Sequence, residues 1–399
     1  MAISTKESRQ YETTHPWLKF QHKFQPSTRT AMLVGEAQSK CEHLAGAPLR
    51  PEVAENLYQV YLVKGAVATT AIEGNTLTED QVLSHMAGES TVPPSQEYQL
   101  QEVRNVVNAL IEIDQAVTIG NRLTLNRARL DELNRRVLDG TEHEPHAIPG
   151  EVREHSVVVG GVYRGAPAEN IDYLINRLCE WLDGPQFVSP DHLVQFGLAL
   201  VKAIIAHVYI AWIHPYGDGN GRTARLVEAQ ILSQSNVPLP AINLLSDFYN
   251  RTRSRYALEL ARTSQEGTLN EFIEYALEGF VDGLRQHIDV VREHQVAVAF
   301  TNYVHELAAS WPQSAASKRR RDLVLALSPT IGTPRFKLTS LTEELAEAYS
   351  ETTDKTLTRD INYLRNVKLI RRTPEGLLQN DAVIRAWLPP AMLAIDFES

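Results

Sequence analysis

Cysteine is almost missing from this sequence, since Cys41 and Cys179 are the only two in 399 residues. Two thiols so far apart in the chain exclude both a disulfide framework and a cysteine-based metal site. The first fifteen residues (MAISTKESRQYETTH) contain no apolar run, so we expect no secretory signal peptide. Internal repeats and low-complexity segments are lacking as well. These absences favour an ordinary globular protein.

Positive charge is also in short supply. The chain has 39 Lys and Arg against 49 Asp and Glu, a net charge of −10, which argues against a protein that coats nucleic acid or anionic membranes without specificity. Residues 192–213 are long and apolar enough to cross a membrane, but Gln195, Lys202 and His207 interrupt them and no second run is comparable. We therefore predict a buried helix there, no membrane segment, and a cytoplasmic protein.

Strand patterns are scarce, and helical periodicity dominates the chain. A length of 399 residues predicts two or three domains. We place them at 1–115 (an N-terminal helical region), 116–311 (a helical core) and 312–399. The expected fold class is mainly α. Helices are predicted at residues 28–44, 51–74, 78–87, 97–117, 124–139, 167–183, 189–212, 222–235 and 244–264, with a last and broken one at 269–311.

The composition changes near residue 312, where a polar and basic stretch leads into a different pattern. Two short helices with apolar faces and two short strands around Pro374-Glu375-Gly376 predict a winged helix-turn-helix. The second helix and wing, residues 354–372, carry six Lys or Arg against two Asp. We favour a module for protein interaction or dimerisation. DNA binding is the alternative, and a DNA-binding repressor is the alternative for the whole chain.

The most informative stretch is HPYGDGNGRTAR, residues 214–225, which joins the long apolar helix to the next helix. Glycines let backbone amides approach a ligand without interference from Cβ atoms. The start of a helix presents unpaired N–H groups and carries roughly half a positive charge. Three glycines that lead into a helix are therefore suited to an anion, above all phosphate.

The side chains of this stretch add acid–base and ionic chemistry. Arg222 and Arg225 are three residues apart on the expected helix, so they share a face and can both bind phosphate oxygens. Asp218 is the only carboxylate of the loop and would be the Mg²⁺ ligand if the anion is a polyphosphate. His214, at the entrance, can accept a proton near neutral pH.

Other phosphate and metal motifs do not fit. A P-loop needs Gly-Lys-Ser/Thr, but Arg222-Thr223 follows Gly221. An EF-hand that began at Asp218 would need a glycine where Thr223 stands. A dinucleotide-binding fingerprint would need a preceding strand. The remaining structural alternative is a glycine-rich connection between two helices, with a capping aspartate and surface arginines.

Residues 214–225 resemble the signature of the Fic family, His-x-Phe-x-Asp/Glu-Gly-Asn-Gly-Arg-x-x-Arg. Every fixed position matches, except that Tyr216 replaces Phe and brings a hydroxyl that needs a partner. The resemblance covers roughly residues 50–290. It also extends to a common bacterial layout of the family, with an N-terminal helical part and a C-terminal winged helix. It implies a Fic-type helical core with a small β-hairpin flap.

Family proteins mostly transfer AMP from ATP to a Ser, Thr or Tyr hydroxyl of a protein. By position, the resemblance implies that His214 is the general base and that Asp218 holds Mg²⁺ against the α- and β-phosphates. The nucleotide-binding residues that it implies are Gly219, Asn220, Gly221, Arg222 and Arg225.

Several alternatives stay open for the reaction. Other family members transfer UMP, phosphocholine or phosphate with the same motif, and the reverse reaction, removal of AMP, is not excluded. The protein target is not given by the sequence. We expect modification of the protein itself and a homodimer.

Residues 155–165 contain an alternating β-branched run and a Gly-Gly turn, which predict a β-hairpin. The hairpin is either a structural excursion between helices or a flap whose edge pairs with a target segment beside His214. The family's target-positioning flap lies at this place, after a Pro-Gly and an Arg, as Pro149-Gly150 and Arg153 stand here. The flap residues would be Val157, Val158, Val159, Gly160 and Gly161.

A second short stretch, TTAIEGN, ends the helix predicted to stop at Gly74. Glu73 opposes the helix dipole there, and its apolar neighbours suggest burial against a cation, although an exposed glutamate is the simpler reading. The stretch resembles the family's inhibitory helix (about 54–74), Ser/Thr-x-x-x-Glu-Gly/Asn, with Thr69, Glu73 and Gly74 in place. The resemblance implies that Glu73 pairs with Arg225 and blocks the site of the γ-phosphate.

Overall fold

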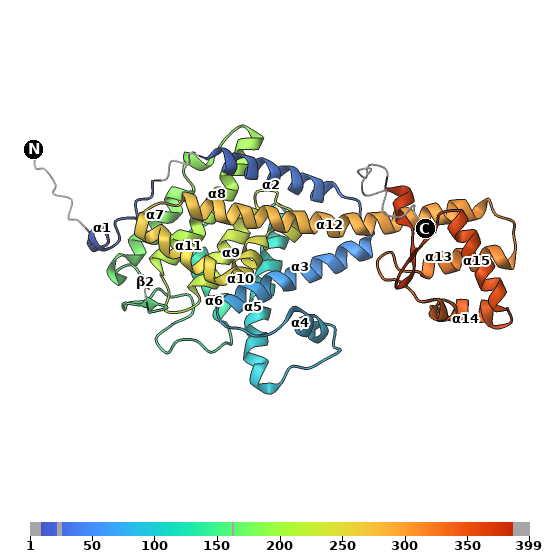
Figure 1. The fold of residues 1–399 in the computed structure, drawn as a ribbon. Helices are drawn as coiled ribbons and strands as arrows, with labels where there is room; N and C mark the ends of the chain where they lie inside the picture. The colour runs from blue at the N-terminus through green and yellow to red at the C-terminus, as the bar shows by residue number, and fades with distance from the viewer. Residues whose placement is uncertain (1–8, 22–25, 162, 386–399) are drawn as a thin grey trace, which may run out of the picture. The chain divides into compact units, whose positions relative to one another are not determined.

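The computed structural model describes residues 9–21, 26–161 and 163–385. The chain forms two compact units, Met1–Ile288 and Asp289–Ser399, here called the N-terminal unit and the C-terminal unit (Figure 1). The division falls within one long helix, earlier in the chain than the change of composition near residue 312. The three-part division expected from the sequence stays a prediction. Its first two parts, 1–115 and 116–311, both contribute residues to one continuous apolar core.

The N-terminal unit is helical, as predicted, with one short hairpin. Its helices are α1 (Gln10–Thr14), α2 (Thr28–Gly46), α3 (Pro51–Ile72), α4 (Glu79–Met86), α5 (Glu97–Thr118), α6 (Arg127–Leu138), α7 (Ile171–Leu182), α8 (His192–Ile213), α9 (Asn220–Ser233), α10 (Leu244–Arg251), α11 (Arg253–Glu266) and the first part of α12 (Asn270–Ala309), which continues into the C-terminal unit. Single 3-10 turns are η1 (Pro94–Gln96), η2 (Ala168–Asn170), η3 (Pro185–Phe187) and η4 (Leu239–Ala241). The hairpin strands are β1 (Val158–Val159) and β2 (Tyr163–Arg164).

Helix α8 lies at the centre of this unit. Its side chains are apolar on nearly every side, so other helices must surround it. Among the described residues, α8 is the helix long and apolar enough to cross a membrane, and 83% of its apolar window is buried inside the protein. Asp191 caps its start by accepting hydrogen bonds from Leu193 N and Val194 N. Helix α9 packs along α8, and α3, α5 and α6 pack on α9.

The long helix α12 corrects one prediction, because it is continuous from residue 270 to residue 309, where a break was expected. The helix contains no proline. Its glycines are places of close packing: a Cβ at Gly279 would lie 2.0 Å from Phe248, and one at Gly283 would lie 2.6 Å from Leu244. The helix predicted at 244–264 is instead broken into α10 and α11 at Thr252.

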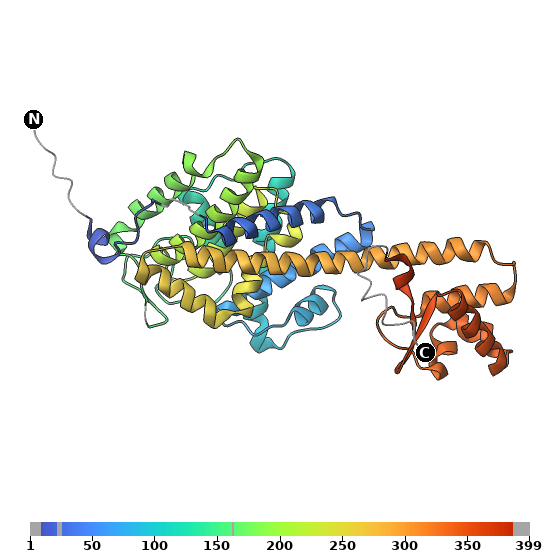
Figure 2. The ribbon, with the colours of Figure 1, turned by 45° about the horizontal axis from the view of Figure 1, so that its top comes forward.

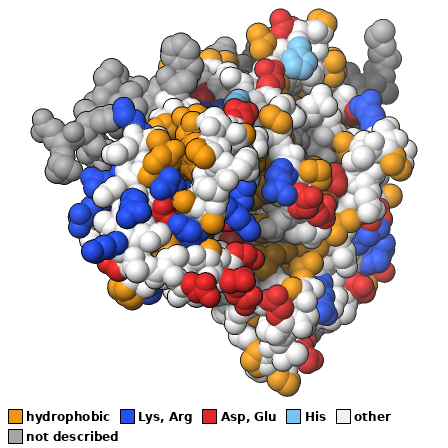
Figure 3. Space-filling view, turned by 90° about the vertical axis from the view of Figure 1, so that its right-hand side faces the viewer, with side chains coloured by type: hydrophobic (Ala, Val, Ile, Leu, Met, Phe, Trp, Pro, Cys, Tyr) orange, Lys and Arg blue, Asp and Glu red, His pale blue; other side chains and the backbone are white. Residues whose placement is uncertain are grey.

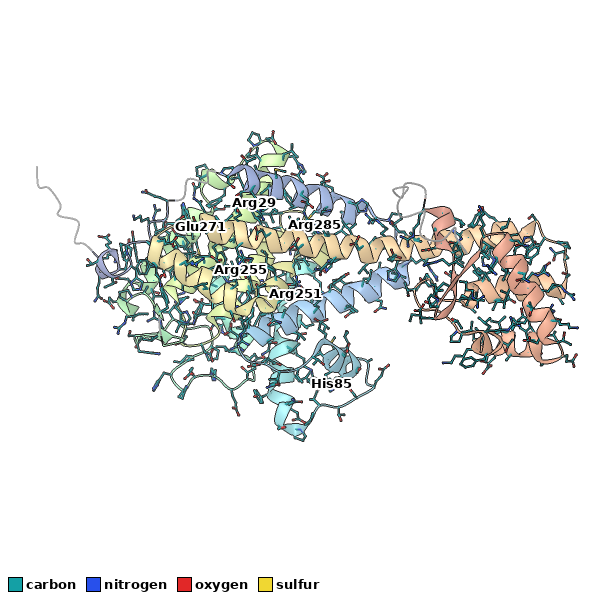
Figure 4. All side chains as sticks on the ribbon, in the orientation of Figure 1. Arg29, His85, Arg251, Arg255, Glu271 and Arg285 are labelled. Carbon is teal, nitrogen blue, oxygen red and sulfur yellow. The ribbon has the colours of Figure 1, made fainter. Side chains whose placement is uncertain are left out.

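Ion pairs join α12 to α2, which lies beside it in both ribbon views (Figures 1 and 2). Arg285 donates to both carboxylate oxygens of Glu36 at 2.8 Å. Arg29 pairs with Glu274 at 3.5 Å and with Glu278, and Figure 4 labels Arg29 and Arg285 on the two helices. These partly exposed pairs fix the register of two amphipathic helices more than they add stability.

The C-terminal unit has its own apolar core and contains the elements predicted for it. They are α13 (Ala315–Ala326), η5 (Arg335–Ser340), α14 (Glu343–Ser350), α15 (Asp354–Asn366), β3 (Ile370–Thr373), β4 (Gly376–Gln379) and η6 (Asp381–Ile384). The strands pair antiparallel, with Ile370 opposite Gln379 and Thr373 opposite Gly376. Helix α13 was not predicted, because it begins in a polar and basic stretch without an apolar helical pattern.

Candidate active site

His214 ends α8 in a conformation that residues other than glycine rarely adopt. Its φ is 50° and its ψ is 62°, and its N–H donates to Ile210 O at 2.8 Å. A non-glycine residue with positive φ is uncommon and persists where the surroundings hold it. This backbone turn ends the helix and directs the following loop toward the start of α9.

Arg153 holds that turn. Its Nε donates to His214 O at 2.7 Å, Nη2 donates to Ala166 O at 2.6 Å, and Nη1 donates to His155 O at 2.5 Å. The side chain is buried and pairs with no carboxylate of the described residues, and burial lowers its pKa to about 10. A guanidinium can satisfy several carbonyl groups at once because its donors form a fixed fork. Arg153 therefore joins the end of α8 to the base of the hairpin.

The imidazole of His214 is neutral at physiological pH. Burial, and then the positive charge of Arg153, lower its pKa from 6.5 to about 4. Glu73 and Asp218 act in the opposite direction but do not outweigh these effects. A neutral imidazole has a free lone pair, so it can accept a proton from a hydroxyl group.

The aromatic residue of the loop is fully buried, and its hydroxyl has the partner that the sequence required. Tyr216 donates through its hydroxyl to Asp131 Oδ1 at 2.9 Å. Its backbone N–H donates to Asn220 Oδ1 at 2.9 Å, and Asn220 Nδ2 donates to Tyr216 O at 2.8 Å. The side chain of Asn220 is thus occupied in closing the loop, which leaves its backbone N–H for a ligand.

Asn134 is a site residue that the sequence analysis missed. Its Nδ2 donates to Asp218 O at 2.9 Å and to Thr223 Oγ1 at 3.3 Å, and its Oδ1 accepts from Gly150 N at 2.9 Å. It lies fully buried on α6 among leucines and valines. The available signal was an asparagine on the apolar face of a predicted helix, since a buried amide must find hydrogen-bond partners. Asn134 therefore holds the loop and the start of α9 against α6.

The start of α9 is open to an anion. Gly219 precedes the helix with a φ of 74°, and no side chain caps the first amides. Those N–H groups have no acceptor within the helix. A Cβ at Gly221 would lie 2.2 Å from Glu73 Oε1, so only a glycine allows a carboxylate to approach this closely. In this structure the carboxylate of Glu73 lies at the place expected for phosphate.

Glu73 and Arg225 lie together, as the sequence analysis expected. Arg225 Nη2 donates to Glu73 Oε1 at 2.6 Å and to Thr69 O at 3.0 Å. The arginine side chain is 1% exposed, and that of Glu73 is 39% exposed, so the expected burial holds only for the cation. Partial removal from water raises the pKa of Glu73, but the positive charge of Arg225 and its hydrogen bond, followed by the charge of Arg222, outweigh this effect and lower the pKa. Thr69 contributes its carbonyl oxygen.

Arg222 is held by two carboxylates. Its Nη2 lies 3.3 Å from Asp218 Oδ1, and its Nη1 lies 3.4 Å from Glu102 Oε1 on α5. Glu102 was not among the predicted site residues. The Nε atoms of Arg222 and Arg225 are buried and have no acceptor among the described residues. A buried donor without a partner is costly, so two of them beside a helix start favour an acceptor-rich ligand.

The hairpin predicted at 155–165 is present and lies next to His214. Val158 pairs with Arg164, and Val159 pairs with Tyr163. Both valines are exposed, and the turn residues Gly160 and Gly161 have φ values of 55° and 72°. Val162 lies outside the described residues. The exposed strand edge is therefore free, among the described residues, to pair with another extended chain.

The base of this hairpin is fixed to the end of α8. Gly165 N donates to Val157 O at 3.1 Å, and Tyr163 donates through its hydroxyl to Trp212 O at 2.7 Å. A Cβ at Gly165 would lie 3.0 Å from the Cβ of His214. An extended segment paired with β1 would therefore pass close to the imidazole. Gly74, the last predicted inhibitory residue, has a φ of 109° and turns the chain away after Glu73.

Comparison with known proteins identifies the region that contains Asn134, the hairpin and the loop at 214–225, whereas Glu73 and Glu102 lie outside it. Residues 124–232 match the model of the Fic/DOC family. The chain is 25% identical over 259 residues to protein adenylyltransferase fic-1 of Caenorhabditis briggsae, covering 65% of this chain and 47% of the relative. It is 30% identical over 234 residues to protein adenylyltransferase Fic of Drosophila grimshawi, covering 58% and 43%. The chain thus spans about half the length of the curated relatives it matches.

Solved structures show the same fold. A Fic family protein from Desulfovibrio desulfuricans G20 aligns with a TM-score of 0.56 at 22% identity, covering 88% of this chain and 94% of that one. Fic-1 from C. elegans aligns with a TM-score of 0.53 at 22% identity, covering 66% and 73%.

Proposed function

We propose that this chain, which contains a Fic domain, is a protein adenylyltransferase that transfers AMP from ATP to a protein hydroxyl. One arrangement supports this most: a neutral histidine stands beside an uncapped helix start, and two buried arginines with unpaired Nε atoms lie on the same helix. We place the reaction in the cytoplasm, in keeping with two buried free thiols. A homodimer and self-modification remain part of the proposal.

The chemistry follows from the positions of these groups. The target hydroxyl gives its proton to the His214 imidazole, and its oxygen attacks the α-phosphorus of ATP. The new P–O bond forms as the bond to the β-phosphate oxygen breaks, so the products are AMP-protein and diphosphate. The amides at the start of α9 and the guanidinium groups of Arg222 and Arg225 bind the phosphate oxygens.

Asp218 is suited to hold Mg²⁺ only together with the nucleotide. The described residues contain no cluster of three or more His, Cys, Asp or Glu that could bind a metal alone. Magnesium sites in such enzymes commonly use one or two carboxylates and complete the shell with phosphate oxygens and water. The side chain of Asp218 is 28% exposed and would supply one carboxylate to such a shell. The ion would neutralise charge on the phosphates.

The test uses purified protein carrying Glu73→Gly, with ATP labelled either at the α- or at the γ-phosphate, and with UTP and CDP-choline as other donors. We expect the protein to take up label from α-labelled ATP only, and expect His214→Ala in the same background to take up label at least about 100-fold more slowly. Uptake from γ-labelled ATP would show phosphoryl transfer. Uptake only from UTP or CDP-choline, or none from any donor, would overturn the proposal.

Replacing Asp218 with asparagine should remove the Mg²⁺ dependence of ATP binding. Asparagine keeps the shape of the side chain but loses the charge that a hard cation requires. Calorimetric titration of ATP with and without Mg²⁺ measures this coupling. The control is Glu144→Gln, since Glu144 is exposed and contributes only its backbone N–H to Asp218, at 3.3 Å. Unchanged coupling in the asparagine variant would rule out the ligand role.

Replacing Arg222 with alanine should weaken the binding of ATP by roughly 10- to 100-fold, the range expected when a charge-assisted hydrogen bond is lost. Binding of AMP should change far less, because AMP lacks the β- and γ-phosphates. Competition binding of both nucleotides to the Glu73→Gly protein compares the two directly. An equal loss for ATP and AMP would contradict the placement of Arg222 at the far phosphates.

A further inference from the structure

Helix α15 has a buried side that contains one carboxylate. Leu357, Ile361 and Leu364 pack into the core of the C-terminal unit, and Asp360 lies among them with 1% of its surface exposed. Asp360 accepts hydrogen bonds from Arg320 Nε at 2.7 Å, Arg319 Nε at 3.4 Å and the Tyr349 hydroxyl at 3.1 Å. The buried carboxylate is therefore satisfied within the unit.

These contacts show that part of the basic stretch in α13 is already paired within the unit. Arg319 and Arg320 point toward Asp360, and Arg320 also lies over the ring of Tyr363, 4.1 Å from its centre. Two of the positive charges of the polar and basic stretch that follows residue 312 thus belong to the interior of the unit. They neutralise Asp360 and fix α13 against α15.

The outer side of α15 carries positive charge and no carboxylate beyond its first residue. Its exposed side chains are those of Lys355, Arg359, Asn362, Arg365 and Asn366, which we call the α15 stripe. Lys355, Arg359, Asn362 and Asn366 recur every three or four residues and so share one face of the helix, and Arg365 lies at the side of that face. The cations of the stripe form no ion pair with any carboxylate in the described part of the chain.

The neighbouring elements limit how a partner can approach. Asp354, at the start of α15, is paired with Arg335 at 2.9 Å. The hairpin that follows α15 adds the exposed Arg372. Helix α14 instead exposes Glu343, Glu344 and Glu347. In the space-filling view, Lys and Arg side chains gather on the left of the face while Asp and Glu form a band below them (Figure 3).

We propose that the α15 stripe binds duplex DNA in its major groove. The stripe covers the twelve residues from Lys355 to Asn366, about 18 Å of helix, and a groove about 12 Å wide admits an α-helix. Arginine and asparagine are the side chains that bind guanine and adenine edges in pairs of hydrogen bonds. The stripe combines both types with a phosphate-binding lysine. The acidic face of α14 and the net charge of −10 oppose non-specific binding of nucleic acid over the protein surface. Contact with DNA is therefore confined to α15 and the hairpin.

The experiment measures fluorescence anisotropy of labelled duplex DNA, with sequences selected from a random pool by the full-length protein. We expect selection to enrich a short sequence, and binding to weaken between about 50 and 200 mM KCl with a log–log slope near −3 to −4, as for three or four phosphate contacts. Arg359→Glu should weaken binding at least tenfold and lower the slope by about 1 or more.

The matched control is Arg177→Glu, which makes the same charge change on an exposed residue of α7 in the N-terminal unit. It should bind DNA as the unchanged protein does. Circular dichroism establishes that both variants are folded. Failure of the unchanged protein to bind at 50 mM KCl, equal losses for both variants, or tighter binding of poly-glutamate than of duplex DNA would overturn the proposal. The last outcome would assign the stripe to an acidic protein partner.

Discussion

Replacing Glu73 with glycine should raise self-AMPylation by an order of magnitude or more. In the present structure Glu73 Oε1 lies 2.6 Å from Arg225 Nη2 and close above Gly221, where a phosphate would otherwise bind. The carboxylate is ionised at neutral pH, because Arg225 and Arg222 hold its pKa below the usual range despite burial. Like charges repel, so this carboxylate excludes the γ-phosphate or displaces it. Glycine removes the carboxylate and leaves Arg225 available.

The measurement is incorporation of α-labelled ATP into the protein itself. Glu55→Gly is the matched control, since it makes the same substitution in α3 at an exposed position, where the Glu55 carboxylate accepts, within the described residues, only from Gln59 Nε2 at 3.1 Å. It should leave the low rate unchanged, which separates loss of the carboxylate from loosening of the helix. Arg225→Ala should not activate, because the phosphate loses its own partner. A Glu73→Gly protein that binds ATP but is no faster than the unchanged protein would refute inhibition by Glu73.

Replacing His214 with alanine in the Glu73→Gly protein should lower the rate of transfer by about 10²- to 10⁴-fold, the usual contribution of a general base. ATP affinity should hardly change, because a lost base affects the transition state more than the bound substrate. Labelling kinetics and calorimetry measure the two quantities. The control is His146→Ala, an exposed histidine of the preceding loop. Equal transfer by the His214→Ala and Glu73→Gly proteins would remove His214 from the mechanism.

The pH dependence of transfer by the Glu73→Gly protein, which retains His214, should follow the titration of this histidine. Its pKa is lowered to about 4, first by burial and then by Arg153, so the imidazole is neutral and active above that value. Transfer should therefore fall as the pH falls toward 4 and should not depend on a group that titrates near 6.5. Bound phosphates carry negative charge and should move the acid limb upward. A rate that rises as the imidazole becomes protonated would contradict a base.

Much of the candidate site could be predicted from the sequence because it is local. Residues 214–225 contain the histidine, the glycines, the aspartate and both arginines in one helix–loop–helix passage, and their order fixes which side chains share a face of α9. Periodicity likewise predicted most helices, the hairpin, and the two helices and two strands from residue 343 to residue 379 of the C-terminal unit. Periodicity did not predict that α12 is continuous or that the chain breaks between α10 and α11, because packing between helices determines both features.

The family pattern led to one long-range contact, that of Glu73 with Arg225, which are 152 residues apart. The residues themselves indicated only that Glu73, at the end of an apolar helix, would pair with a cation if it is buried. The supporting contacts had no such pattern. They are made by Asn134 with the loop, by Asp131 with the Tyr216 hydroxyl, and by Arg153 with the carbonyl groups around His214. Each of these three residues is distant in the sequence from the group that it contacts.

In the C-terminal unit the same limit applies to charge. The sequence determined how many cations α13 and α15 carry, and the spacing of those on α15. Only the tertiary structure showed that Arg319 and Arg320 face Asp360 while Arg359 and Lys355 face outward. Local periodicity determines which residues of one helix share a face, because that depends on backbone geometry alone. Which faces meet, and which buried polar groups find partners, depends on packing between helices far apart in the chain, and this was decided by the tertiary structure.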